Sequence, residues 1–210
     1  DISTFVGTDA TTLTGSATGS TTITGGAGAD TITGCSAADT FVASAGNDIV
    51  SAGSGTVVDA FQFTGALLEA NSGTTATYDG GDGVDTLTVT TAATTLVDAD
   101  FRGLTSIESL ITNNGVNSIT LGSNADAAGI VTITDGTGAD TIVLSDAAFD
   151  NTVTINVGDG IDTVTLGAQT ATVVLTGANV AANDSDVITG FTTGTDKLNL
   201  NAVTTATSLT

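Results

Sequence analysis

Several residue types on which enzymes and nucleic-acid-binding proteins depend are missing or scarce in this chain. Its 210 residues include no His, Pro, Met or Trp, and two basic residues stand against 23 acidic ones, for a net charge of -21. Without His, the Ser-His-Asp and Cys-His arrangements and a His-ligated zinc site are excluded. With Arg102 and Lys197 as its only cations, the chain is poorly suited to nucleic acid or to an anionic membrane surface.

Cysteines, long apolar runs and aromatic residues are scarce as well. Cys35 is the only Cys, so no intrachain disulfide forms; a tolerated free thiol in a turn is the simplest interpretation, ahead of an interchain bridge or a modification. No apolar run approaches the length of a membrane span, and we expect no membrane insertion. Tyr78 and scattered Phe residues form no row of platforms for a sugar-binding cleft, so we predict that the chain is not an enzyme.

The acids that are present are almost all Asp, with Glu69 and Glu108 as the only Glu residues. A hydrophobic content of 40% argues against global disorder despite the charge. Acidity that served solubility alone would use both acids, so the bias favours Asp as a turn former and a short-armed oxygen ligand. Isolated acids such as Asp1, Asp9 and Asp59 fit a solvated surface instead.

A repeat of nine residues organises the stretch from Gly25 to Ser51, which reads GGAGADTIT, GCSAADTFV and ASAGNDIVS. Such a period predicts a solenoid. In each block the first six residues turn and the last three extend, because Gly tolerates positive φ whereas Thr and Ile prefer extended backbone. The residues in phase are Asp30, Asp39 and Asp48, each followed two positions later by Ile32, Phe41 or Val50.

Two blocks complete one flattened, right-handed coil in this interpretation. Asp30 and Asp48 should then stack on one edge, with Asp39 on the opposite edge, while the apolar residue of each block points inward. Carboxylates stacked about 4.8 Å apart repel by roughly 1 kcal/mol in water. A hard divalent cation removes that cost, and calcium takes the oxygen shell that carboxylates and turn carbonyls supply.

The repeat returns in GGDGVDTLT, from Gly80 to Thr88, and more loosely around residues 135 to 165. Gly-Asp turns also occur as ordinary β-turns without metal, which remains the alternative for the later sites. The predicted calcium ligands, from side chains or turn carbonyls, are Gly25, Gly26, Gly28, Asp30, Asp39, Gly46, Asp48, Gly80, Gly81, Asp82, Gly83, Asp85, Asp135, Asp140, Asp159 and Asp162.

These nonads resemble the G-G-x-G-x-D-x-U-x repeat of the RTX calcium-binding proteins. The segment DVITGFTTGTDKLNL, Asp186 to Leu200, resembles one that commonly follows RTX repeats near the C-terminus of proteins exported by type I secretion. The second block departs from the pattern with Ala37 in place of Gly, and the third lacks its first two Gly. We therefore expect a weaker or absent site on that edge.

The predicted fold class is all-β, a parallel β-roll or β-solenoid with Gly-Asp turns and short irregular inserts. We divide it into residues 1–64 and 65–210. Residues 1–24 read as degenerate coils held by Thr ladders, and the pattern decays after Ser51. The stretch from Gly65 to Gly73 is a short helix or a strand-capping loop, and one helical turn is expected near Asp98 to Arg102.

The resemblance implies a calcium-binding protein secreted to the extracellular cell surface. We expect a structural, self-assembling S-layer or filament subunit, with other copies of the chain as partners in an oligomer or polymer and a cell-surface polysaccharide as a further candidate. The alternative is an RTX carrier module of a larger secreted enzyme, toxin or adhesin. Because the sequence begins at Asp1 without Met, we expect a piece of a longer precursor.

Overall fold

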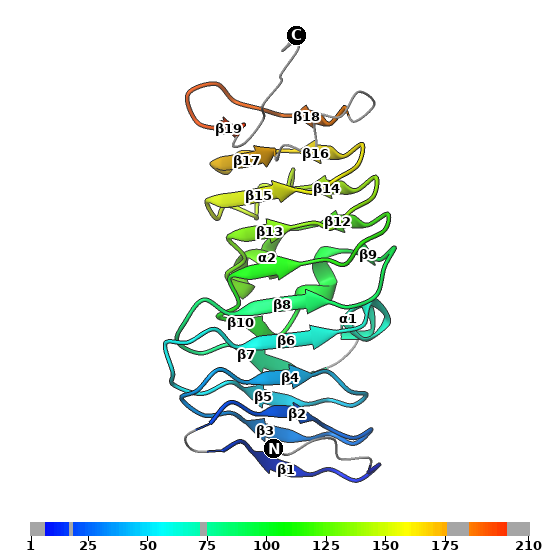
Figure 1. Cartoon of the computed structure of the whole chain (residues 1–210), viewed down its shortest axis with the longest axis vertical. Helices are drawn as coiled ribbons and strands as arrows, with labels where there is room; N and C mark the ends of the chain where they lie inside the picture. Colours follow the sequence, from blue (N-terminus) through cyan, green and yellow to red (C-terminus); the bar gives the residue numbers. More distant parts are fainter. Residues whose placement is uncertain (1–6, 17–18, 72–74, 176–184, 201–210) are drawn as a thin grey trace.

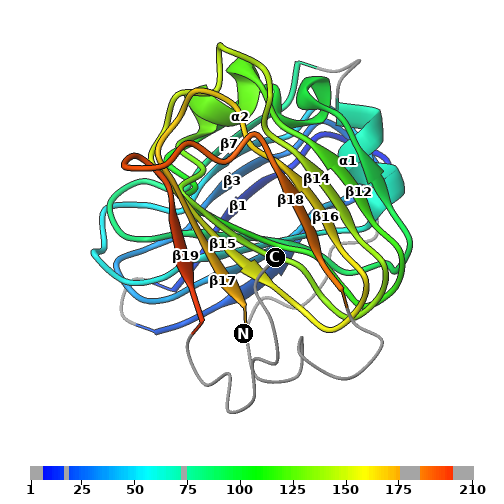
Figure 2. The ribbon, with the colours of Figure 1, turned by 90° about the horizontal axis from the view of Figure 1, so that it is seen from above.

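Each coil of the chain places one short strand on either side of a narrow core, and successive coils stack along the long axis of the molecule (Figure 1). This computed structural model describes residues 7–16, 19–71, 75–175 and 185–200. Seen along the stack, strands and turns enclose the core as a flattened ring (Figure 2). The predicted parallel β-solenoid is confirmed.

One side of the stack is a continuous nine-stranded sheet, which we call the long sheet. All its strands pair in parallel. Because β6 pairs with β8, the sheet continues without a break from residues 1–64 into residues 65–210. Its strands in spatial order are β2 (Thr22–Thr24), β4 (Thr40–Val42), β6 (Ala60–Phe63), β8 (Thr86–Val89), β11 (Ser109–Ile111), β13 (Thr132–Thr134), β15 (Val153–Val157), β17 (Ala171–Leu175) and β19 (Lys197–Asn199).

The opposite side is divided between two five-stranded sheets. The lower sheet, nearer the N-terminus, contains β1 (Thr12–Thr14), β3 (Thr31–Thr33), β5 (Ile49–Ser51), β7 (Thr77–Asp79) and β10 (Leu104–Thr105). The upper sheet contains β9 (Thr95–Leu96), β12 (Ser118–Thr120), β14 (Thr141–Val143), β16 (Thr163–Thr165) and β18 (Val187–Thr189). The irregular elements are α1 (Gly65–Asn71), the 3-10 turn η1 (Asp98–Phe101) and α2 (Ser123–Ala128).

The strand register confirms the predicted coil of two nine-residue blocks. Ile32 of β3 lies beside Val50 of β5, and Ile23 of β2 lies beside Phe41 of β4, eighteen residues further on in each case. The central residue of each strand is buried while its neighbours face outward, as alternation along a strand requires. In the lower half, aromatic rings fill this core: the ring of Phe41 stacks on that of Phe61 at 5.1 Å between centroids.

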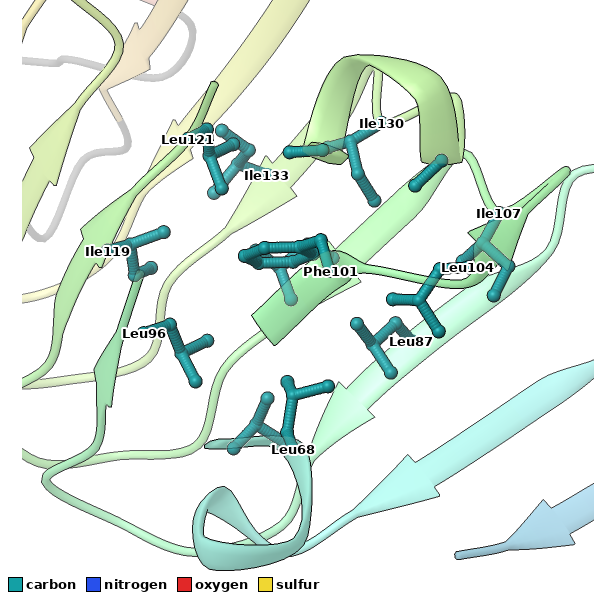
Figure 3. Packing of buried hydrophobic residues seen from close by; sticks show 14 of the residues in the cluster. Leu68, Leu87, Leu96, Phe101, Leu104, Ile107, Ile119, Leu121, Ile130 and Ile133 are labelled. Carbon is teal, nitrogen blue, oxygen red and sulfur yellow. The ribbon is translucent and has the colours of Figure 1, made fainter. Parts of the chain in front are cut away.

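The inserts close the core where the lower five-stranded sheet gives way to the upper one. Phe101 of η1 is fully buried there, with Leu68 of α1 below it and Ile130, which follows α2, above it (Figure 3). Of the two alternatives for the stretch from Gly65, the short helix is the one present, and the helical turn predicted near Asp98 is present too. Both contribute side chains to the core. Helix α2 is an addition that the sequence pattern did not predict. Among the described residues, no helix is both long and apolar enough to cross a bilayer.

Two expectations about particular segments are wrong. Asp59 is not a solvated surface acid: it is 1% exposed and accepts the N–H of Asp39 at 2.6 Å, so the repeat continues beyond Ser51 into β6. The first described coil is also not held by Thr and backbone contacts alone. The N–H groups of Thr11 and Thr21 donate to the carboxylates of Asp30 and Asp39 in the second coil.

Candidate metal centre

The residue just before many of the strands belongs to a column along an edge of the stack, and Asp is the commonest residue in these columns. The backbone N–H of this residue points toward the next coil, one position before the strand ladder begins. The carboxylate or amide of the equivalent residue in that next coil accepts it. We call each such contact a side-chain rung, because it extends the β-ladder by one hydrogen bond.

The long sheet carries four consecutive rungs in its lower half. Thr21 donates to Asp39 at 2.7 Å, and Asp39 donates in turn to Asp59. Asp59 donates to Asp85 at 2.7 Å, and Asp85 donates to Glu108 at 2.8 Å. A hydrogen bond from an N–H to a charged acceptor contributes about 1.5–3 kcal/mol. The rungs therefore explain why the sequence prefers Asp, whose carboxylate lies close to its own backbone.

The lower and upper five-stranded sheets have rungs of the same kind. In the lower sheet, Asp30 donates to Asp48 at 3.0 Å, so the predicted stacking of these two acids on one edge, opposite Asp39, is confirmed. In the upper sheet, Asn117 donates to Asp140 at 2.5 Å and Asp140 donates to Asp162 at 2.7 Å. Columns of buried acids therefore stand at both edges of the stack.

The second carboxylate oxygen has a partner within the protein in the three blocks from Gly25 to Ser51. Oδ2 of Asp30 accepts the N–H of Gly26 at 2.8 Å, and Oδ2 of Asp39 accepts the N–H of Cys35 at 2.8 Å, which closes each turn. Oδ2 of Asp48 accepts the hydroxyl of Ser44 at 3.1 Å. In these three blocks both oxygens are occupied by hydrogen bonds within the protein.

Three buried carboxylates meet on the edge that joins the long sheet to the upper sheet. One oxygen from each of Asp135, Asp140 and Asp162 lies within 4.8 Å of the others. Asp135 is 5% exposed and Asp140 is 1% exposed, and Oδ2 of each is buried without a hydrogen-bond partner. Oδ1 of Asp135 accepts the N–H of Gly158.

This cluster fits a calcium ion by the chemistry and the spacing of its oxygens. Two ligands of one ion can lie at most twice the Ca–O bond apart, about 5 Å for bonds of 2.3–2.6 Å, and the three oxygens meet that limit. The partnerless Oδ2 atoms of Asp135 and Asp140 supply a reason for an ion, because a buried polar atom without a partner is costly. Asp135, Asp140 and Asp162 would hold the ion, which would neutralise charge that no basic residue reaches.

Burial and crowding also perturb the acidity of the cluster. Burial, with the nearby charges of Asp162, Asp140 and Asp186, raises the pKa of Asp135 to about 8 from its ordinary value of 3.8. Burial likewise raises the pKa of Asp140, although its hydrogen bonds with Asn117 oppose that shift. A cation at this point would favour the deprotonated forms, because a coordinating carboxylate must lose its proton.

A second position with an unsatisfied buried oxygen is Asp85. It is fully buried, and its Oδ2 has no hydrogen-bond partner. Burial, together with the charges of Asp59, Glu108 and Asp79, raises its pKa to about 6. Asp85 is therefore the predicted ligand in the lower half whose surroundings most resemble those of the three-carboxylate cluster.

The glycines of the turns set the distance between coils. Gly138 and Gly160 occupy the fourth position of successive blocks, with φ of 141° and 145°, a conformation that favours glycine. A Cβ on Gly160 would lie 1.8 Å from the carbonyl oxygen of Gly138, and a Cβ on Gly158 would lie 1.7 Å from that of Gly136. The turn carbonyls of one coil thus press directly on the glycines of the next.

The remaining predicted ligands lie on these edges in different surroundings. Asp82 and Asp159 are exposed and lie outside the three-carboxylate cluster. Ala37, the departure in the second block, does not adopt positive φ, so the strain expected there is avoided. The predicted glycine carbonyls belong to the turns before β3, β5 and β8, at Gly25, Gly26, Gly28, Gly46, Gly80, Gly81 and Gly83.

Sequence reasoning missed the members of the columns that lie outside recognisable nonads. The side chains of Asn117 and Glu108 accept the backbone N–H groups of Thr94 and Asp85, respectively. The carboxylate of Asp186 accepts the N–H of Asp162 at 3.0 Å. The signal that finds them is position, because each immediately precedes a short strand with an apolar centre. In the last coil, Asp196 plays the same part for Ala171.

Comparison with known families agrees with this geometry. The family model of the RTX calcium-binding nonapeptide repeat (4 copies) matches residues 16–50 and 36–56. No curated protein and no solved structure matches the chain. The matched stretch contains the blocks of Asp30, Asp39 and Asp48, and Asp140 repeats their rung geometry beyond the match. Residues 16–56 of the chain therefore carry RTX nonapeptide repeats, a type of repeat that binds calcium.

Proposed function

We propose that the chain is a structural, self-assembling protein of the extracellular cell surface, an S-layer or filament subunit that calcium folds and cross-links. The observation that carries the proposal is the set of buried acid columns on both edges of the stack, in a chain with two basic residues. Two cations can neutralise at most two of the 23 acids. The stack therefore depends on positive charge from its surroundings.

Calcium outside the cell supplies that charge. Weak extracellular modules bind calcium at about 10⁻⁴ to 10⁻³ M, whereas free calcium inside cells is very low. Because ligand deprotonation and folding are coupled to metal binding, the chain would stay poorly folded until export and fold afterwards. RTX-repeat proteins are typically secreted, which agrees with this order of events.

A structural role also fits the surroundings of the acids. Asp135, Asp140 and Asp162 are buried, so a substrate has no access to them as an acid–base pair. Along the columns, one oxygen of each acid already accepts a backbone N–H from the preceding coil. We therefore propose no catalytic activity for the described part of the chain.

The alternative function, a carrier module of a larger exported protein, is supported by the last coil. The segment from Asp186 to Leu200 forms β18 and β19, the last strands that the structure describes. Asp196 accepts the N–H of Ala171 at 2.9 Å and that of Thr192 at 2.8 Å, so this segment is part of the stacked fold. It is also the segment that resembles the C-terminal part of type I exported proteins.

A calcium titration distinguishes the two functions. Far-UV circular dichroism and sedimentation velocity would follow the full chain from excess chelator to millimolar calcium. We expect a transition from coil to β-structure, followed by growth into large species. A transition that ends at a monomer would favour the carrier module. A chain already folded in chelator would contradict the calcium dependence itself.

A further inference from the structure

The outward face of the long sheet carries no carboxylate, and with nine strands it is the longest of the three sheet faces on this acidic surface. Its strands present two outward residues each, stacked in register from β2 to β19. Thr or Ser occupies the first outward position on every strand except β6, which has Ala60, and β19, which has Lys197. The second position holds Thr, Val, Ile, Gln or Asn.

The size of this face separates it from the opposite side of the stack. Nine strands spaced about 4.8 Å apart give a length of about 38 Å, and strands of three to five residues give a width of about 10–17 Å. Paired with an equal face, it would bury about 800–1,300 Å² in total, close to the roughly 1,000 Å² expected of a specific interface. Each five-stranded sheet offers about half that length. The two are separated by elements that carry Glu69 and Asp98.

The net charge of the chain indicates which partner this face binds. Two copies that each carry a net charge of -21 repel one another wherever their carboxylates meet, and like charges brought together across an interface cost several kcal/mol. The long sheet is the largest face on which two copies can touch without bringing acids together. Its Thr side chains offer both methyl groups and hydroxyls, and therefore suit contact with an identical surface. Aromatic platforms for a sugar chain do not occur among its outward residues.

We propose that the outward face of the long sheet is the interface through which calcium-folded copies of this chain pair with one another. The inference rests on the proposed self-assembling function and identifies the contact surface that it uses. A two-fold axis along the strands would place β8 of one copy over β13 of the other, because β11 is the central strand. A two-fold axis along the stack would place each strand over its own copy.

Charge substitutions on this face test the proposal in the full chain with calcium. Thr86 on β8 and Thr132 on β13 face outward, and both two-fold arrangements bring these positions opposite one another, with an offset of at most about 7 Å in the plane of the interface. The double variant Thr86→Glu and Thr132→Glu should associate at least about tenfold more weakly in sedimentation velocity. The matched control, Thr31→Glu and Thr120→Glu, adds the same charge to the opposite side and should associate like the wild type.

A mixing experiment makes the test specific for self-pairing. The variant Thr86→Lys and Thr132→Lys should restore association when it is mixed with the Glu variant, because opposite charges then meet across the interface. Far-UV circular dichroism in calcium would verify that each variant is folded. If the wild type assembles and the Glu variant assembles equally well, the proposed interface is overturned while the assembling function stands. A folded wild type that remains monomeric overturns both.

Discussion

Replacing Asp140 with Asn separates the two roles of the three-carboxylate cluster. Asn retains an Oδ1 that can accept the N–H of Asn117, just as Asn117 itself accepts the N–H of Thr94 at 3.1 Å in the coil below. The rung is therefore kept, whereas one negative charge and one carboxylate oxygen are lost. In chelator the variant should be more stable than the wild type, because two carboxylates 4.8 Å apart repel by about 3.5 kcal/mol at an effective dielectric constant near 20.

In calcium the same substitution should reduce the stability that the ion adds. A site with a dissociation constant of about 10⁻⁴ to 10⁻³ M adds about 1.4–2.7 kcal/mol to the free energy of unfolding at about 10 mM calcium. If the loss of one of three carboxylates weakens binding about tenfold, the calcium increment falls by about 1 kcal/mol. Because the wild type is expected to be poorly folded in chelator, the first change is measured as a larger folded fraction of the variant in far-UV circular dichroism without calcium. The second change is measured by urea unfolding at two calcium concentrations.

Asp150→Asn is the matched control for this experiment. Asp150 is exposed on the turn after β14, and the substitution removes the same charge away from the cluster. Its calcium increment should equal that of the wild type. An Asp140→Asn variant with an undiminished increment would refute the assignment of Asp140 as a ligand, and an unchanged stability in chelator would refute the repulsion.

Three further predictions concern acidity, turns and the core. The folded-state pKa values of Asp85 and Asp135, about 6 and about 8, lie above the ordinary 3.8, so the folded chain holds these protons more tightly than the unfolded chain. The folded fraction in chelator should therefore fall as the pH rises from about 4 to about 8, and calcium should flatten that slope in far-UV circular dichroism measured across the range. Gly160→Ala should destabilise the chain by more than about 2 kcal/mol in urea unfolding in calcium, because the residue has positive φ and the added Cβ would clash with the carbonyl oxygen of Gly138. Gly194→Ala is the control, because Gly194 has φ of 90° but no atom near the position of a Cβ. It should cost only the roughly 1–2 kcal/mol of backbone strain. Phe101→Ala should cost about 3–5 kcal/mol in the same assay, against little change for Phe191→Ala, whose ring is 40% exposed; equal effects would contradict the packing around η1.

The fold could be predicted largely because its period is local. A block of nine determines where the chain turns and which residue faces inward, so the pairing of Ile32 with Val50 followed from spacing alone. Segments in which the block is not nine residues long were harder to predict. The turn before Asp59 lacks the Gly-Gly signal, and the column position of Asp59 becomes evident only from the strand that follows it.

The residue types of the site could be predicted from the sequence, but the sequence did not show which of the acids have an oxygen without a hydrogen-bond partner. Spacing identified Asp30 and Asp140 as equivalent turn acids, yet their second oxygens differ. That of Asp30 accepts the N–H of Gly26, whereas that of Asp140 has no partner. The difference depends on where neighbouring coils place their N–H groups and on Asp135, which enters from the preceding strand end. Helix α2 escaped prediction because its six residues are too short to show a helical period.

The side-chain rungs give the stack a polarity that its repeating sequence conceals. Every rung runs the same way, with an N–H of one coil bound by a carboxylate or amide of the coil that follows it in the chain. Removing coils from the C-terminal end would therefore strip acceptors from buried N–H groups, whereas removing them from the N-terminal end would leave carboxylates that water can solvate. Whole coils can be added or deleted most safely at the start of such a stack, so its length can change in evolution from one end more easily than from the other.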